Sequence, residues 1–491
     1  MIHTYPSWVF NYPPGPKPSW PFGNEIPSNR QWLKFDEWRR RYGDVVRITV
    51  MGQPAVILGS FKAANDLLDS RGTRSIYSDR PSAAMAGELV GWARGMGYSP
   101  YNNRFREFRR TFNHSIGPKA CQRTEFMAME ETENKKFLRN VLDDPERFFE
   151  HARQSTGSLL LRLAYGYSVE TKDDPFVKIA EDAMLGFSQA SEPGAFWVDS
   201  FPLLKYVPSW VPGAGFKKVA YRMRQDLERL YSVPYDFVKS EMSKGTALPS
   251  FTSTFLEEKM ETPDAKEEEF IKAACASLYS DGKPPPTPSS VTSFILAMTL
   301  NPAVQARAHA ELDALIGKDV RLPTFTDRQY LPYVNAIVKE VLRWNPSVPL
   351  GLPHVCTEED MYEGYQIDEG TTVWANIWSI LHDELIYPEP SEFRPERYLG
   401  EDGQLRALER AEDPAQIAFG FGRRICPGMS LADNSVFLAV STLLYIFNIS
   451  KAKDADGEDI TPAIEYDGFI CHPQPFRCCI APRSVELAAL L

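Results

Sequence analysis

The chain has 491 residues, of which 43% are hydrophobic and 12% aromatic, and its formal net charge is -11. The apolar content excludes a disordered chain, and the length leaves room for a large domain or for two domains. The negative charge disfavours a general nucleic-acid binder, so we expect no nucleic-acid partner. The seven cysteines are odd in number and show no zinc-site spacing, which indicates a reducing, intracellular compartment rather than a disulfide scaffold.

Residues 1–18 form a proline-rich N-terminal segment, which predicts a rigid and extended entry to the folded part of the chain. Residues 1–10 hold neither an apolar stretch of membrane-spanning length nor a signal-peptide pattern, so we expect no transmembrane anchor in this chain. The longest apolar run, residues 436–447, is too short to span a bilayer and predicts a buried helix.

The following elements are predicted from hydrophobic periodicity and turn residues. They are, in chain order, an amphipathic helix at residues 31–41, strands at 45–50 and 55–58, a helical stretch from 118 to 312, short strands from 348 and a last helix after Cys426. This order predicts a mainly α fold with a small β lobe (α+β), built as a single domain over residues 19–491.

The strongest signal is the loop at residues 419–428, which reads Phe-Gly-Phe-Gly-Arg-Arg-Ile-Cys-Pro-Gly. Gly420 and Gly422 allow a tight backbone turn close to a flat ligand. Cys426 comes directly before a predicted helix, and the positive end of a helix favours a thiolate. Arg424 offers a planar fork that suits a carboxylate. A shorter motif would favour an inert buried cysteine instead.

The order of residues in this loop resembles the haem-binding signature of the cytochrome P-450 superfamily. The signature positions would be Phe419, Gly422, Arg424, Cys426 and Gly428, the last of which would permit close helix approach. The resemblance implies haem b (iron protoporphyrin IX) as the cofactor, with Cys426 as the metal ligand that favours cleavage of the O–O bond. It also implies the cytochrome P-450 fold, with the haem between a long central helix and the cysteine-loop helix. It covers nearly the whole chain and points to fungal microsomal monooxygenases of secondary metabolism, including members similar to tryptamine 4-hydroxylase.

A second pattern, Glu340-Val-Leu-Arg343, lies in a helix expected at residues 332–344. Glu340 and Arg343 share one helix face and can form an ion pair. Together with a later Pro-Glu-Arg397 they resemble two further motifs of the family. The resemblance implies a buried network of Glu340, Arg343 and Arg397 behind the haem loop, with a structural role, because a buried charge needs a partner.

Two further haem contacts are implied by the resemblance. Arg109, in a short basic helix, would meet a haem propionate, although Phe105 replaces the family's usual tryptophan and its N–H donor. His354 would also face a propionate, and a turn histidine is an equally weighted alternative. The other arginines of the basic helix form a solvated face by default, and docking of an acidic reductase is the alternative.

The segment at residues 281–288 departs from the family pattern. The family's long helix over the haem carries an acid and a threonine that deliver protons to bound oxygen. Here Pro285 stands at the position of the acid and Pro286 at that of the first threonine, while Thr287 matches the second. Each proline costs about 3 kcal/mol in a helix interior, so we expect the central helix to break. Asp281 and Thr287 are the catalytic candidates that could substitute for the missing relay.

The resemblance implies an oxidoreductase of the monooxygenase type. It would insert one oxygen atom of O2 into a hydrophobic small molecule, such as a terpenoid or aromatic metabolite or a xenobiotic. Electrons would come from NADPH through cytochrome P-450 reductase, and the expected location is the surface of the endoplasmic reticulum, by peripheral contact. The alternative is a haem-thiolate isomerase or dehydratase, or a haem-binding variant with impaired turnover. The pocket is expected to be lined by residues 85–98, Phe187, Trp197, and residues 276–287, 348–352 and 468–470.

Overall fold

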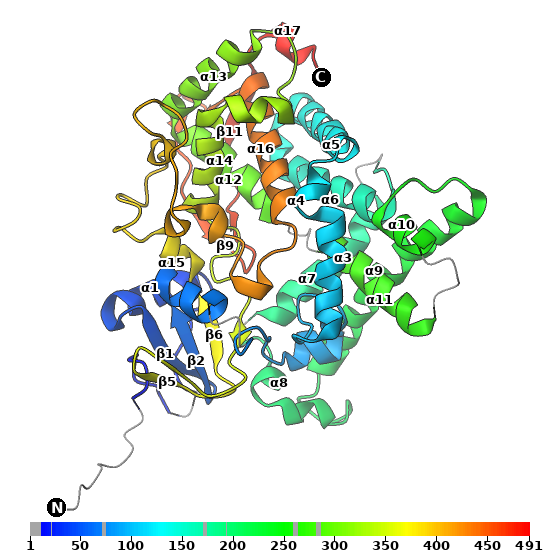
Figure 1. The fold of residues 1–491 in the computed structure, drawn as a ribbon, viewed down its shortest axis with the longest axis vertical. Helices are drawn as coiled ribbons and strands as arrows, with labels where there is room; N and C mark the ends of the chain where they lie inside the picture. Colours follow the sequence, from blue (N-terminus) through cyan, green and yellow to red (C-terminus); the bar gives the residue numbers. More distant parts are fainter. Residues whose placement is uncertain are drawn as a thin grey trace, which may run out of the picture.

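The computed structural model describes residues 11–20, 22–70, 75–169, 174–192, 194–258, 264–280 and 286–491. Helices make up most of this part of the chain, which confirms the mainly α prediction (Figure 1). The α-helices are α1 (Gln31–Tyr42), α2 (Phe61–Ala64), α3 (Asn103–Ile116), α4 (Pro118–Cys121), α5 (Thr124–Asp143), α6 (Phe148–Tyr165), α7 (Pro175–Ser191), α8 (Trp197–Ser200), α9 (Phe216–Lys244), α10 (Phe251–Glu258), α11 (Ala265–Ser280), α12 (Pro286–Leu300), α13 (Pro302–Ile316), α14 (Pro332–Trp344), α15 (Ile377–Leu381), α16 (Met429–Ile446) and α17 (Val485–Ala488).

The strands are short and gather in small sheets, as the predicted β lobe requires. They are β1 (Val45–Val50), β2 (Gln53–Leu58), β3 (His354–Val355), β4 (Asp360–Tyr362), β5 (Tyr365–Ile367), β6 (Thr372–Ala375), β7 (Phe447–Lys453), β8 (Asp459–Ile460), β9 (Tyr466–Asp467), β10 (His472–Pro473) and β11 (Cys478–Pro482).

The largest sheet joins the N-terminal strands to strands that lie some 300 residues later in the sequence. Its order is β1-β2-β6-β3, with β1 and β2 antiparallel, β2 and β6 parallel, and β6 and β3 antiparallel. Ala55 pairs with Thr372, and His354 pairs with Val373. Figure 1 shows β1, β2 and β6 beside α1, apart from the larger helical region. Strand β3 therefore carries His354 to the boundary between the lobe and the helices.

Residues 11–18 of the proline-rich segment lie against this lobe. The backbone N–H of Arg47 on β1 donates a hydrogen bond to Pro14 O at 3.0 Å. The guanidinium of Arg47 stacks on the ring of Tyr12 at 3.7 Å. The extended segment is therefore held on β1 by its backbone and by one aromatic side chain.

Helices α12 and α16 form the centre of the helical region and are apolar on nearly every side. The residues of α12 from Pro288 to Thr299 are all buried, and so are those of α16 from Val436 to Ile446. A helix that is hydrophobic all round requires neighbours on every face, and α5, α6, α13 and α14 supply them. The prediction that residues 436–447 form a buried helix is confirmed up to Ile446, and β7 begins at Phe447.

By length and composition, α16 is the one helix of the described residues that could cross a membrane. The protein itself buries 67% of this helix, and its apolar character is accounted for by that packing.

The central helix is divided in two. Helix α11 ends at Ser280, and α12 begins at Pro286. The expected separation into two helices is therefore confirmed, although the second begins at Pro286 rather than at residue 291. Pro286 and Pro288 occupy the first turn of α12, where the missing N–H of a proline would have no helical partner in any case. Asp281 and residues 282–285 lie outside the described residues.

Candidate active site

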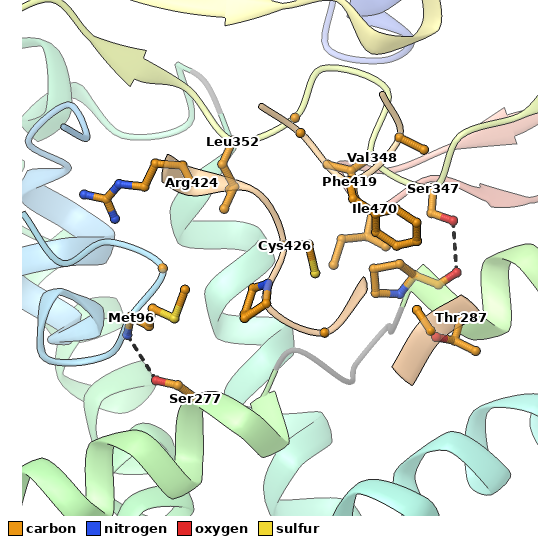
Figure 2. Close-up of a pocket in the computed structure, with 18 of the residues that line it drawn as sticks. Met96, Ser277, Thr287, Ser347, Val348, Leu352, Phe419, Arg424, Cys426 and Ile470 are labelled. Atoms are coloured by element: carbon orange, nitrogen blue, oxygen red, sulfur yellow. Dashed lines mark hydrogen bonds between the residues drawn. The ribbon is translucent and has the colours of Figure 1, made fainter. Parts of the chain in front are cut away.

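A cavity of about 310 Å³ lies between the helical region and the β lobe. This volume falls at the lower end of the range of about 300–1,000 Å³ that is typical of ligand pockets. Its walls come from residues 92–98, α11, the start of α12, residues 347–354 and the cysteine loop at residues 418–428. Figure 2 shows Cys426 among side chains from these separate segments, including Met96, Thr287 and Leu352.

The structure agrees with most of the predicted pocket lining. Phe187, Phe469 and Ile470 line the cavity together with parts of residues 92–98, 277–287 and 348–352. Trp197 does not. Its side chain is 57% exposed and stacks on Phe201 at 6.0 Å, because α8 lies on the outer surface. The prediction for Trp197 was wrong.

The backbone of the cysteine loop is held from two directions. The N–H of Cys426 donates to Phe419 O at 2.9 Å, which closes the loop directly before α16. The guanidinium of Arg109 on α3 donates to Ile425 O at 2.5 Å. Arg109 is not among the described residues that line the cavity, and it braces the backbone of the loop, while its expected contact with a propionate stays a prediction. Its positive charge interacts with Cys426, and a cation beside a thiol favours the thiolate.

The three glycines of the loop differ in what requires them, and the expected turn at Gly420 beside the cavity is confirmed. Gly420 lines the cavity with φ +82°, and the space that a Cβ would occupy there is open. Gly422 has φ +58°, and a Cβ would lie 2.1 Å from Leu68 O, so this glycine is required by the protein's own packing and not by a ligand. At Gly428 the nearest atoms to a Cβ are 3.9 Å away, so the expected close helix approach is absent.

Arg424 is buried, and two of its guanidinium nitrogens donate to backbone oxygens of the protein. Its Nε donates to Ser78 O at 2.6 Å and its Nη2 to Ser99 O at 2.7 Å. The guanidinium lies 3.8 Å from the ring centroid of Phe105. The phenylalanine that replaces tryptophan therefore supports this arginine by a cation–π contact in place of an N–H donor. Burial lowers the pKa of Arg424 to about 10, and Asp79 opposes this shift.

Sequence reasoning missed Arg80, which lines the same part of the cavity. Its Nη1 donates to Leu352 O at 2.8 Å and to Pro353 O at 2.7 Å, while its Nε is buried without a hydrogen-bond partner. Burial and the neighbouring Arg424 lower the pKa of Arg80 to about 9. The buried guanidinium of Arg424, the partly buried guanidinium of Arg80 and its unused N–H donor form a wall that suits an anionic, oxygen-bearing ligand.

His354 completes this basic wall. It lies on β3, so the alternative of a turn histidine is wrong. Its Nδ1 is 2.7 Å from Tyr77 O, and since a carbonyl can only accept, Nδ1 carries the proton. Burial and Arg80 lower the pKa of His354 well below its usual value, so the ring is neutral and Nε2 is an acceptor. His354 would donate to a carboxylate only as imidazolium, which a nearby anion would favour.

Glu340, Arg343 and Arg397 come together as predicted. Glu340 and Arg343, both on α14, have fully buried side chains and form a two-point ion pair with two contacts of 2.8 Å. Arg397, in the short helix η8 (Pro395–Tyr398), donates to Glu340 Oε1 at 3.3 Å. The N–H of Arg394 and the hydroxyl of Tyr398 also donate to this carboxylate, at 2.8 and 3.1 Å. One buried carboxylate thus holds η8 against α14.

Of the two catalytic candidates, Thr287 lines the cavity, in the first turn of α12. The oxygen of Pro286 beside it accepts a hydrogen bond from Ser347 Oγ at 2.9 Å, drawn as a dashed line in Figure 2. Asp281 lies outside the described residues.

Comparison with known proteins adds to this geometry. A family model described as cytochrome P-450 matches residues 13–480. Cytochrome P-450 monooxygenase 208 of Postia placenta is 47% identical, over 98% of this chain and 92% of the relative. Cytochrome P-450 monooxygenase claR of Ampulloclitocybe clavipes is 43% identical, over 98% of this chain and 88% of the relative. Tryptamine 4-monooxygenase of Psilocybe cyanescens is 40% identical, over 97% of this chain and 94% of the relative.

Proposed function

The chain belongs to the cytochrome P-450 family and is a monooxygenase, and from this premise we propose that Cys426, as a thiolate, would hold the iron of haem b. The observation that carries the proposal is the position of Cys426 on the wall of an apolar cavity, directly before the start of α16. When bound, the haem supplies the activation of O2, and a thiolate ligand favours O–O cleavage. The product would be an oxygenated hydrophobic small molecule.

The residues around the cavity fit a haem. Its two propionates are carboxylates, and the basic wall of Arg80, Arg424 and His354 offers guanidinium groups to receive them. The buried Nε of Arg80 has no partner among the described residues, which is the feature that an absent carboxylate oxygen would explain. Gly420 leaves open space where a flat ring can approach the backbone. Arg109 would act on the thiolate side, by fixing Ile425 and the loop.

The lining favours a neutral, apolar substrate. Trp92 meets Phe187 at 4.9 Å edge to face, and Tyr98 meets the same ring at 5.8 Å. Among the described residues, no Asp or Glu lines the cavity, so nothing there would pair with a protonated amine. We therefore propose a terpenoid or a neutral aromatic metabolite or xenobiotic as the substrate class, although one relative is named for tryptamine.

We propose that electrons come from NADPH through cytochrome P-450 reductase. The exposed Arg423 of the cysteine loop donates to the hydroxyl of Tyr101, and the exposed Arg106 of α3 stacks on the same ring at 5.2 Å. Arg110 of α3 is also exposed. This basic surface adjoins the loop that carries Cys426, and its charge would attract an acidic redox partner.

We also propose peripheral contact with the membrane of the endoplasmic reticulum. Residues 197–210 expose several large apolar side chains, namely Trp197, Phe201, Leu203, Tyr206 and Trp210. Phe22, near the start of the chain, meets Trp197 at 6.2 Å. Exposed aromatic clusters of this kind mark surfaces that bind a membrane interface or a partner.

The test is product formation in cells that supply the reductase. With a panel of terpenoids and aromatics and with isotopically labelled O2, one labelled oxygen atom should appear in the product, and only when the reductase is present. Product that carries oxygen from water, or that forms without the reductase, would contradict the proposal.

The division of the central helix favours one alternative, a haem-thiolate isomerase or dehydratase or a haem-binding variant with impaired turnover. The expected acid–threonine pair is absent from α12, so oxygen activation would lack its usual proton source. Conversion of an organic peroxide without the reductase, together with no reductase-driven product, would support the isomerase or dehydratase. Haem binding without either reaction would support the impaired variant.

A further inference from the structure

A second, smaller cavity lies beside the one that Cys426 lines. It has a volume of about 40 Å³ and is lined by residues of α5, α6, α12 and α16. Thr156, Leu159, Thr287 and Ser435 line both cavities and form the wall between them, and three of these four carry a hydroxyl group. A polar cavity needs only about 10–15 Å³ to hold a water molecule. The small cavity can therefore hold water directly behind Thr287.

The small cavity contains a buried carboxyl group, that of Glu130 on α5. Ser435 Oγ donates to Glu130 Oε1 at 3.0 Å, and Asn434 Nδ2 donates to Glu130 Oε2 at 3.2 Å. Burial raises the pKa of Glu130 to about 8, and the carboxylates of Glu131 and Asp433 add to this shift. Glu130 thus carries a proton at neutral pH. The amide nitrogen of Asn434 is a donor and cannot accept this proton.

A path leads from this cavity to the surface. Glu133, the second carboxylate that lines it, accepts from Ser158 Oγ at 2.7 Å and from Lys136 Nζ at 2.8 Å. The side chain of Lys136 is 43% exposed, whereas that of Glu133 is 2% exposed. Cys121 on α4 also faces Glu130, but burial raises its pKa to about 12, so it is uncharged. The ion pair of Glu133 and Lys136 therefore connects the water-sized cavity with solvent.

We propose that Glu130 holds the proton that oxygen activation consumes in the neighbouring cavity and that it acts through the hydroxyl wall of Thr156, Thr287 and Ser435. This inference rests on the proposed monooxygenase function, and it names a proton supply where Pro285 and Pro286 replace the acid and the threonine of the family pattern. Glu130 is a positioning residue, because it reaches the reacting atoms only through water and Thr287.

Hydroxylation of a C–H bond by O2 takes up two electrons from NADPH and two protons, and it releases one water molecule. The carboxyl group of Glu130 gives its proton to water in the small cavity, which passes a proton past Thr287. The Glu130 carboxylate then regains a proton from solvent along the ion pair of Lys136 and Glu133. No electron passes through these residues.

The experiment uses the haem-loaded enzyme and two readouts that need neither the native substrate nor the reductase. The first is the rate at which hydrogen peroxide oxidises a phenolic dye, because the O–O bond breaks only when the departing oxygen receives a proton. The second is the infrared band of a buried neutral carboxyl group. Glu130→Gln removes the proton store and keeps the side-chain size, and Glu125→Gln, at an exposed position of the same helix, is the matched control. Glu130→Asp retains the acid and tests rescue.

We expect Glu130→Gln to lower the peroxide-driven rate by about a hundredfold, the contribution of a positioned proton donor, and Glu125→Gln to leave it unchanged. The wild-type rate and the infrared band should both decline as the pH rises through about 8, and the Glu130→Gln variant should show neither change. Glu130→Asp should recover part of the rate. If Glu130→Gln fails to bind haem, Ser435→Ala replaces it and should also slow the reaction.

A Glu130→Gln enzyme with the wild-type peroxide rate and pH profile would overturn the proposal, and so would an infrared band that survives the substitution. Failure of the monooxygenase function itself looks different. In that case the Glu130 effects on the peroxide reaction and on the infrared band persist, while the reductase gives no product with any substrate.

Discussion

Removal of the Glu340 carboxylate should destabilise the protein more than removal of any single exposed charge. In Glu340→Ala, five donated hydrogen bonds disappear at once, two of them from the fully buried Arg343. Loss of one partner of a buried ion pair costs about 3–5 kcal/mol. Arg343 keeps contacts to the carbonyl oxygens of Leu381, Pro390 and Glu392, which places the expected loss near the lower end, about 3 kcal/mol.

A loss of this size is a large part of the total stability of a protein, which is about 5–15 kcal/mol. We therefore expect Glu340→Ala to shift the urea unfolding midpoint downward and to give little haem-loaded protein. The control is Glu37→Ala, which removes a 2.8 Å ion pair to Lys34 on the exposed face of α1 and should cost less than about 1 kcal/mol. Equal midpoints for the two variants, with full haem loading in both, would refute the reasoning.

Three further predictions concern the loop, the basic wall and the exposed aromatic surface. Gly422→Ala should abolish haem loading because its Cβ would collide with Leu68 O, whereas Gly428→Ala should load normally, as measured by the ratio of haem to protein absorbance. Arg80→Met should speed haem loss to an acceptor protein by about tenfold or more, since a hydrogen bond to a charged group contributes about 1.5–3 kcal/mol. An unchanged rate would show that Arg80 does not hold a propionate. Trp210→Ser, at a side chain that is 81% exposed, should reduce retention on membranes after high-speed centrifugation without altering thermal unfolding, and unaltered retention would contradict the membrane contact.

Local sequence patterns predicted the elements whose limits are set by nearby residues. Helix α14 begins and ends at the predicted residues because Pro332 starts it and Asn345-Pro346 stops it. The pair of Glu340 and Arg343 follows from helical spacing alone. The assignment of residues 1–18 as a segment and of residues 19–491 as one domain stays a prediction.

The features that the sequence did not predict depend on contacts between distant segments. Arg80 precedes a proline in a loop. Its place on the cavity wall follows only from its hydrogen bonds to the backbone oxygens of residues 352–353, which are distant in the sequence. Glu130 and Glu133 belong to a charged stretch that is typical of a solvated helix face, yet α16 and α6 bury both. Trp197 looked like a pocket residue from its position in the chain, but α8 places it on the surface.

The most direct test of the central claim is the absorption spectrum of the reduced, CO-bound protein, for the wild type and for Cys426→Ser. We predict a thiolate-type Soret band for the wild type. The Cys426→Ser variant should lose this band and keep most of its helix content, measured by circular dichroism. A thiolate-type band that persists in Cys426→Ser would contradict the assignment of Cys426 as the haem ligand.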